Sequence, residues 1–193
     1  MTEAWVATSP KRADARRNIA AILDAARECL ARDPDSSIND IAKAAGVGRV
    51  TLYGHFESRA ELVSQVVAQA IAESEESLSA VDLTGDPREA LGRLLEASWE
   101  VTQRFGSLVV AAEGAIPADE LREAHAAPAR RVRKLIRRGR SAGTFRRDMP
   151  LEWQVTIMQS IVHGASLAVH RGEITASQAS RLVRETGLAA LSG

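Results

Sequence analysis

The sequence SINDIAKAAGVGRVTLYGHFESR, from Ser37 to Arg59, determines how the N-terminal part of the chain folds. It contains two short helical patterns joined by a tight turn at Ala45-Gly46-Val47. Ser37 is placed to cap the first helix, and Asp40 stands where the acid of a capping box belongs. Gly46 can take a positive φ at the end of that helix without steric cost, because glycine has no Cβ atom. The stretch therefore predicts two helices in immediate succession.

The second of these helices, expected over about Arg49 to Phe56, presents a short row of polar side chains. Leu52 and Phe56 face the core, and the other faces carry Arg49, Val50, Thr51, Tyr53 and His55. A short helix of this kind fits the DNA major groove, where each base pair displays its own pattern of donors and acceptors. The pattern favours a helix-turn-helix, and an ordinary helical hairpin is the alternative.

The residues before this stretch predict a further helix and an N-terminal arm. Apolar residues recur at helical spacing from about Asp14 to Arg32, so this helix should complete a three-helix core. We expect residues 1–12 to form a loose arm with a basic end, followed by Arg16 and Arg17. These cations are suited to phosphate contacts, but a frayed and solvated terminus explains them equally well.

The motifs IAKAAGV, TLYGHF and SRAEL, which lie between Ser37 and Leu62, resemble the DNA-binding segment of the TetR-like family of bacterial one-component transcriptional repressors. The resemblance implies a DNA-binding head over residues 1–57 and a larger helical body for ligand binding and dimerisation over residues 58–193. The remaining two thirds of the chain resemble the family only in their layout of helices.

The resemblance also implies which residues face DNA. Tyr53 and His55 would meet the phosphate backbone, and Arg59 stands where the family usually has a cation near a phosphate. Gly48 replaces a usual serine, so a hydroxyl that caps the recognition helix is missing. Val50 and Gly54 also depart from the usual pattern. The complete predicted DNA-binding set is Ser37, Arg49, Val50, Thr51, Tyr53, His55, Arg59, Arg16 and Arg17.

The composition indicates a soluble globular protein. Of the 193 residues, 45% are hydrophobic and 26% charged, and the formal net charge is zero. Overall charge therefore does not attract nucleic acid, and any DNA affinity must come from local charge. Cys29 is the sole cysteine, which suits a reducing compartment. No apolar run reaches the roughly 20 residues of a membrane span, and the N-terminus is no signal peptide, so we expect a cytoplasmic protein with no membrane contact.

The rest of the chain reads as further helices, and no segment shows a trustworthy strand pattern. We therefore expect an all-α fold. The predicted segments are a long helix opened by Ser58 and Glu61, a helix from Pro87 that stops at Gly106, a short helix over residues 108–112, and a helix over residues 119–142 with a break or kink near Ala126, caused by Pro128. After the break, residues 130–140 are strongly basic. This stretch could bind an anionic ligand or DNA, or pair with acids of neighbouring helices.

Two terminal helices carry more apolar surface than one subunit easily covers. The first, over residues 151–171, is hydrophobic nearly all round and should be buried on every side. The second, capped by Thr175 and Gln178, runs to about Leu191. The simplest resolution is a two-fold four-helix interface between protomers. Its predicted residues are Ile157, Ile161, Gly164, Ala165, Ala168, Leu182 and Val183.

The sequence offers no candidate catalytic site, cofactor site or metal site. Gly46-Val47-Gly48 follows a helix rather than a strand and is not a dinucleotide-binding motif. The segment around Ser166 lacks the second glycine of a nucleophile elbow. The four histidines have no metal-binding partner spacing. We therefore expect a protein that is not an enzyme.

The body is larger than dimerisation requires, and by the resemblance it would enclose a small-molecule pocket. Large or polar side chains in converging segments predict its lining: Trp99, Gln103, Glu113, His125, Trp153 and His163. The predicted function is a homodimeric repressor, bound to a near-palindromic operator and released by an unknown small-molecule effector. Two alternatives stay open: a DNA-binding regulator without an effector, and a helical ligand-binding or enzymatic protein whose head has lost DNA binding.

Overall fold

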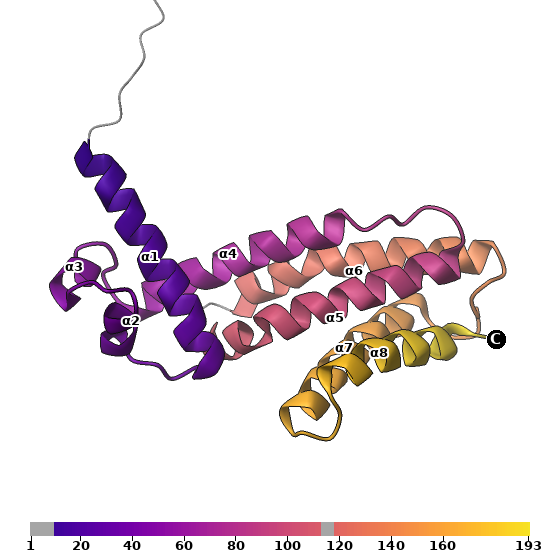
Figure 1. Cartoon of the computed structure of the whole chain (residues 1–193). Helices are drawn as coiled ribbons and strands as arrows, with labels where there is room; N and C mark the ends of the chain where they lie inside the picture. Colours follow the sequence, from indigo (N-terminus) through magenta and orange to yellow (C-terminus); the bar gives the residue numbers. More distant parts are fainter. Residues whose placement is uncertain (1–9, 113–117) are drawn as a thin grey trace, which may run out of the picture. The chain divides into compact units, whose positions relative to one another are not determined.

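In the computed structural model, which describes residues 10–112 and 118–193, every regular element is an α-helix (Figure 1). This confirms the all-α prediction. The helices are α1 (Pro10–Arg32), α2 (Ile38–Ala44), α3 (Arg49–Tyr53), α4 (Arg59–Ser79), α5 (Pro87–Ala112), α6 (Ala118–Ser141), α7 (Leu151–His170) and α8 (Ala176–Leu191).

The described residues form two compact units, whose boundary differs from the predicted domain boundary. One unit contains residues 10–69 and 107–112, and the other contains residues 70–106 and 118–193. The division therefore falls inside α4, between Gln69 and Ala70, and not before that helix. We refer to them as the first and second units.

The first unit is built on α1, α2 and α3, which share a core with the start of α4. Its fully buried side chains include Ile22, Leu30, Ile41, Leu52, Phe56 and Leu62. Leu52 and Phe56 face inward as predicted. Helix α1 begins at Pro10, earlier than the predicted Asp14, and so includes Lys11 and Arg12, which were expected in the N-terminal arm. Proline is tolerated there, since the first helical turn needs no amide hydrogen from it. Residues 1–9 lie outside the described residues.

The start of α2 and the turn between α2 and α3 both have the interactions that the sequence predicts. The Ser37 side chain accepts a hydrogen bond from the Asp40 amide and the Asp40 carboxylate accepts one from the Ser37 amide, which completes a capping box. Gly46 has a φ of 68°, in the left-handed region that favours glycine. Helix α3 ends at Tyr53, earlier than the predicted Phe56, and Gly54 forms its C-cap.

The second unit has a core around Trp99, which is 2% exposed. Helix α5 contributes Leu91, Leu94 and Leu95 to this core. Asp86 caps α5 as expected, because its carboxylate accepts hydrogen bonds from the amides of Arg88 and Glu89.

Two predicted helix ends, at Gly106 and near Pro128, are absent from the described structure. Helix α5 continues through Gly106 to Ala112, because one glycine costs a helix interior only about 1 kcal/mol. Helix α6 likewise contains Pro128 without ending there. The residues that follow it, Val132, Leu135 and Ile136, are buried, and their packing offsets the hydrogen bond that proline removes.

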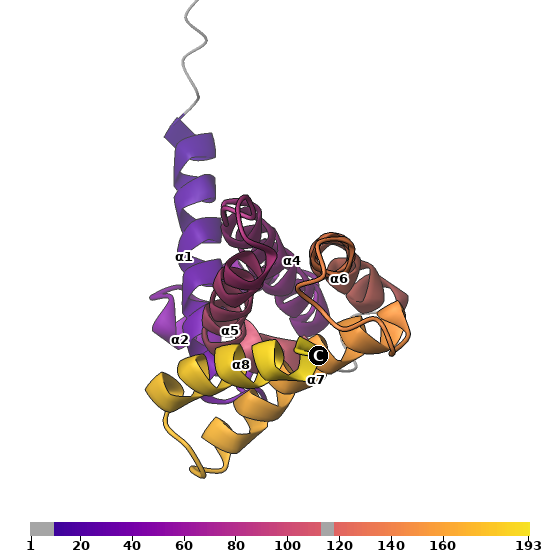
Figure 2. The ribbon, with the colours of Figure 1, turned by 90° about the vertical axis from the view of Figure 1, so that its right-hand side faces the viewer.

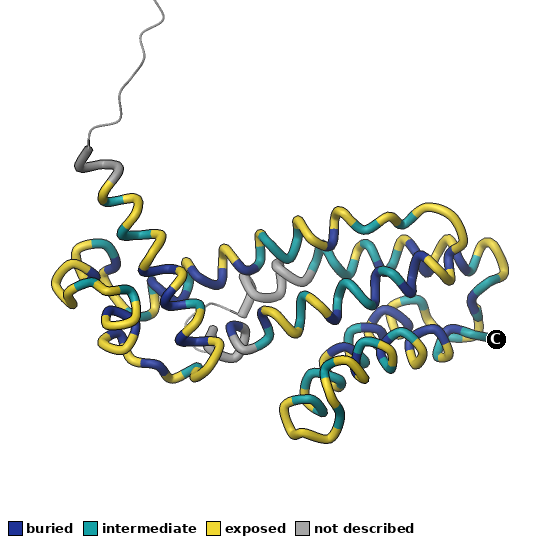
Figure 3. The backbone as a smooth tube through the Cα atoms, in the orientation of Figure 1, coloured by how far each residue is buried: buried dark blue, intermediate teal, exposed yellow. Residues whose placement is uncertain are grey.

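Helices α7 and α8 pack against each other in the second unit, side by side in two views (Figures 1 and 2). The burial of α7 on every side, which the sequence predicts with the help of a second protomer, is present on one face of the helix in the single chain. Its inward face carries Gln154, Val155, Met158 and Val162, which are buried. Trp153 is 55% exposed and Leu167 is 48% exposed, so the opposite face remains open (Figure 3).

Candidate nucleic-acid interface

Helix α3 presents most of its side chains outward. Arg49, Val50, Thr51 and Tyr53 are all exposed, and His55 just after the helix is half-buried. Only Leu52 within α3 is buried. The helix contains no acidic residue, so nothing on it repels a phosphate backbone. The structure therefore brings five predicted DNA-binding residues onto one short segment of the first unit.

Arg49 and Tyr53 form a row along one face of α3. The guanidinium carbon of Arg49 lies 5.4 Å from the centroid of the Tyr53 ring, within the range of a cation–π interaction. Residues four apart lie on the same helical face, which explains the contact. The stacking holds the guanidinium near the ring, where both groups present donors to a ligand.

The N-terminus of α3 lacks a side-chain cap. Gly48 occupies the N-cap position and makes no side-chain hydrogen bond, as the sequence predicts. Ser37, by contrast, is exposed but engaged in its own cap, and its hydroxyl lies 2.5 Å from a carboxylate oxygen of Asp40. The hydrogen bonds from Ser37 lower the pKa of the Asp40 carboxyl. Ser37 therefore fixes the start of α2.

Arg59 has a structural role that sequence reasoning missed. Its guanidinium donates to the carbonyl oxygen of Pro34 over 2.6 Å and to that of Ser36 over 3.1 Å. Arg59 is the first residue of α4, and the two carbonyl groups belong to the loop between α1 and α2. The guanidinium thus ties the start of α4 to the loop from which α2 begins.

The two arginines predicted beside the interface are exposed on α1. Arg17 forms an ion pair with Asp14 one turn earlier, which reduces its availability to a phosphate. Arg16 is exposed as well. The DNA-contacting role of both arginines stays a prediction.

The predicted ligand-binding residues do not converge on one interior site. Trp99 is 2% exposed and belongs to the core, whereas Trp153 is 55% exposed. Gln103 and His163 are exposed too. The Glu113 prediction lies outside the described residues, and so does the side chain of His125. Among the side chains that the structure describes, the interior position expected for Trp153, Gln103 and His163 is therefore wrong.

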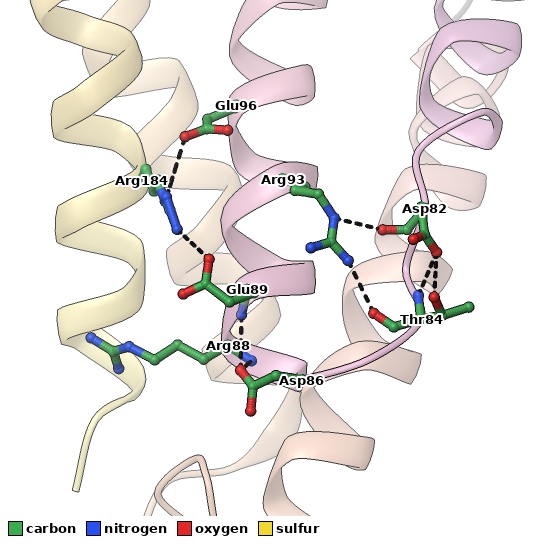
Figure 4. Close-up of polar contacts among 8 residues, drawn as sticks. All are labelled: Asp82, Thr84, Asp86, Arg88, Glu89, Arg93, Glu96 and Arg184. Atoms are coloured by element: carbon green, nitrogen blue, oxygen red, sulfur yellow. Dashed lines mark hydrogen bonds and ion pairs between the residues drawn. The ribbon is translucent and has the colours of Figure 1, made fainter.

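The second unit has a surface groove with a volume of about 610 Å³ between the start of α5 and α8. None of the predicted ligand-binding residues lines it. Arg184 of α8 crosses this region and pairs with Glu89 at 2.7 Å and with Glu96 at 3.4 Å (Figure 4). The guanidinium lies against Gly92, where a Cβ atom would stand 2.8 Å from its Nε atom. The ion pairs hold α8 to α5.

Two arginines donate hydrogen bonds to the backbone of the loop between α4 and α5. Arg93 donates to the carbonyl oxygens of Asp82 and Thr84 over 2.8 and 3.0 Å (Figure 4). Arg138 of α6 donates to those of Leu83 and Gly85 over 2.5 and 3.1 Å. The contacts of Arg138 could not be predicted from the sequence, because they join segments that are more than fifty residues apart along the chain.

The basic part of α6 is largely paired with its neighbours. Arg131 binds Glu75 and Arg133 binds Glu152 in two-pronged ion pairs. Their guanidinium groups lower the pKa of both carboxyl groups. Pairing with nearby acids, one of the alternatives drawn from the sequence, thus accounts for these two cations. The basic residues that remain exposed on one stripe are Arg130, Lys134 and Arg137.

Two further classes of site are not seen. Across residues 10–112 and 118–193, no group of acidic, histidine or cysteine residues could hold a metal ion. No described helix is both long and apolar enough to cross a bilayer.

The sequence of the first unit matches a known family. Residues 22–66, which run from α1 into α4, fit the model described as bacterial regulatory proteins, tetR family. The HTH-type transcriptional repressor LfrR of Mycolicibacterium smegmatis is 35% identical over 82 residues, which make up 42% of this chain and 43% of that protein. This alignment therefore spans less than half of the relative.

The fold matches solved structures over nearly the whole chain. The crystal structure of LfrR from Mycobacterium smegmatis in complex with proflavine has a TM-score of 0.69 at 23% identity, over 90% of this chain and 95% of that one. A regulator from Saccharomonospora viridis in complex with choline has a TM-score of 0.78 at 19% identity, over 91% and 97% of the two chains. A TetR family regulator from Agrobacterium tumefaciens has a TM-score of 0.75 at 22% identity, over 93% and 100%.

At these identities the structures show a shared fold alone. Together with the family model, they confirm the resemblance recognised in the motifs of the sequence. The matched proteins are regulators and not enzymes, in agreement with the sequence analysis.

Proposed function

The chain is similar to the TetR family of regulatory proteins, in sequence over residues 22–66 and in fold over most of its length, and from this we propose that it is a sequence-specific DNA-binding transcriptional repressor. The observation that carries the proposal is the outward face of α3. Arg49, Thr51 and Tyr53 stand exposed on a helix without acids, which is held in the first unit by the buried side chain of Leu52. The DNA major groove can accommodate such a helix.

The proposal includes a homodimer. Helix α7 leaves Trp153 and Leu167 exposed in the protomer, and Ile157, Ile161 and Ala168 are only partly buried. A Cβ atom at Gly164 would meet nothing within 4 Å, so this surface has room for the close approach of a partner helix. Val183 is the exception among the predicted interface residues, because it is 1% exposed and lies in the chain's own core. A two-fold dimer would place two α3 helices on half-sites about 34 to 36 Å apart.

The effector of the proposed repressor is a small molecule bound by the second unit. Two of the similar structures are complexes with small molecules, one with proflavine and one with choline, which supports a ligand-binding body in this fold. The effector would weaken operator binding only by the ratio of its affinities for the two conformations. The second candidate is a regulator without an effector, favoured by the tight core around Trp99.

Selection of genomic fragments by the purified cytoplasmic protein tests DNA recognition. We expect the wild-type protein to recover one short, near-palindromic site. Arg49→Ala and Tyr53→Ala should abolish this recovery, because they remove the exposed row on α3. Arg137→Ala is the matched control, since it removes an equally exposed cation from α6 and should leave recovery unchanged.

A wild-type protein that recovers no fragment above background would contradict the proposal. Equal recovery by the Arg49→Ala and wild-type proteins would show that α3 does not make the contact. A strong decrease of affinity with salt would accompany true operator binding, because the protein displaces counterions from the phosphates.

A further inference from the structure

Val50 is the most exposed large hydrophobic residue among the described residues. Its side chain is 87% exposed, compared with 55% for Trp153 and 48% for Leu167. A single exposed valine on an ordinary surface needs no explanation. Val50, however, is the second residue of α3, the helix that the proposed function places in the major groove.

The surroundings of Val50 leave its methyl groups prominent. The residue four positions later is Gly54, which lies on the same face and has no side chain. Gly54 is also exposed. Because no side chain stands at Gly54, a base edge could approach the helix closely beside Val50.

The nearest cation does not occupy this face. The guanidinium of Arg49 lies over the ring of Tyr53, 5.4 Å from its centroid, and so belongs to the neighbouring row of the helix. The side chain of Val50 can neither donate nor accept a hydrogen bond. It can thus recognise only an apolar group on a base edge.

The major groove displays one such group in unmodified DNA, the C5-methyl group of thymine. Resting on the proposed function, we propose that Val50 is a specificity-determining residue that contacts a pyrimidine C5-methyl group in each operator half-site. Thymine carries this methyl group, and so does 5-methylcytosine. The contact would exclude water from both apolar groups and so favour a methylated pyrimidine at that position.

The test replaces each thymine of the recovered operator by deoxyuridine, one position at a time. Uracil lacks only the C5-methyl group. We expect one position per half-site at which wild-type affinity falls about fourfold, the factor that corresponds to the burial of one methyl group. Replacing this thymine by cytosine should weaken binding, and 5-methylcytosine should bind more tightly than cytosine.

The variants assign the effect to Val50. Val50→Ala, and Val50→Ser, which has a hydroxyl in place of the two methyl groups, should bind the thymine operator more weakly and lose the discrimination between thymine and uracil at that position. Thr51→Ser removes a neighbouring exposed methyl group and should keep the discrimination. Thermal unfolding should be unchanged in all three, since both side chains are exposed in the protein.

Three results would overturn the inference. The first is that no thymine is sensitive to uracil substitution, and the second is that the sensitivity persists in Val50→Ala. In both cases operator binding itself would stand. If the wild-type protein binds no operator at all, the proposed function fails, and the inference fails with it.

Discussion

At the scale of single residues, Arg59 has two competing interpretations: it holds the helix-turn-helix together, or it contacts a DNA phosphate. Its guanidinium already donates to the carbonyl oxygens of Pro34 and Ser36, two groups of the loop before α2. A side chain committed in this way positions the helix-turn-helix and is less free to meet a phosphate. The two roles differ in their response to salt, because only a phosphate contact releases counterions.

We predict that Arg59→Ala lowers the free energy of unfolding by about 1 to 2 kcal/mol, since two carbonyl groups lose a charged donor. The slope of log affinity against log salt should stay at its wild-type value. Chemical denaturation and operator titrations at several salt concentrations measure the two quantities. Arg16→Ala is the control: its exposed side chain should leave stability within about 0.5 kcal/mol.

The opposite pattern would refute this assignment of Arg59. In that case Arg59→Ala would unfold like the wild-type protein, and its salt slope would be reduced by about 0.9, as expected for one lost phosphate contact.

Gly139 offers a second residue-scale prediction. A Cβ atom there would overlap the ring of Phe145, which is 2% exposed. Gly139→Ala should therefore destabilise the protein by about 1 to 3 kcal/mol, the usual cost of overpacking. Gly106→Ala, also inside a helix, meets Ser166 at an ordinary 3.7 Å and should stabilise by about 0.5 to 1 kcal/mol. Thermal unfolding that gives both variants the same sign would contradict the packing around Gly139.

At the scale of helices, the sequence predicted what local chemistry controls. Ser37 with Asp40, Gly46, and Thr175 with Gln178 all act between residues close in the chain, and all take their expected roles. The helix ends predicted at Gly106 and near Pro128 are absent, because tertiary packing outweighs the low helix propensity of glycine and proline.

Long-range contacts could not be predicted from the sequence. Arg59 meets the loop before α2 across more than twenty residues, and Arg138 meets the loop after α4 across more than fifty. Nothing in either neighbourhood marks the partner. The exposed residues of α3 could be identified from the helical periodicity of the sequence. The predicted pocket residues could not, because their positions depend on how the helices pack, which periodicity does not determine.

The pair between Arg131 of α6 and Glu75 of α4 gives the second unit a defined response to pH. Hydrogen bonding from Arg131 lowers the pKa of Glu75 below its ordinary value of 4.5. A lowered pKa in the folded protein contributes stability above pH 4.5, and this contribution disappears as the pH falls through the lowered value.

We predict that Glu75→Gln destabilises the protein by about 0.5 kcal/mol at pH 7, a small value because the carboxylate is partly exposed and screened by solvent. The difference from wild type should shrink below pH 4.5 and vanish in stronger acid. Denaturation curves across this range provide the measurement. Glu76→Gln removes an exposed neighbouring carboxylate outside the pair and should show no such trend. A deficit of Glu75→Gln that stays constant down to strong acid would rule out the pair as its cause.

At the scale of the whole molecule, the open face of α7 argues for a partner. Trp153 and Leu167 are exposed at the two ends of this helix, and Gly164 between them has open space above it. Burying such side chains stabilises an interface by roughly 1.5 to 3 kcal/mol each. Val183 of α8 is buried in the core of its own chain. This predicted interface residue is therefore not available to a partner.

We predict that Leu167→Glu leaves the protomer folded and converts the dimer to a monomer, because it places a charge on a surface that a partner would cover. Sedimentation equilibrium at micromolar concentration measures the change in mass, and circular dichroism checks the helices. Operator affinity should fall by on the order of 100-fold, since the two half-sites would no longer be bound as one unit. Ser141→Glu makes the same change in charge at an exposed position of α6 and should remain dimeric. A monomeric wild-type protein would contradict the dimer. A Leu167→Glu variant that stays dimeric would place the dimer interface elsewhere. In either case the exposed face of α7 would need another partner.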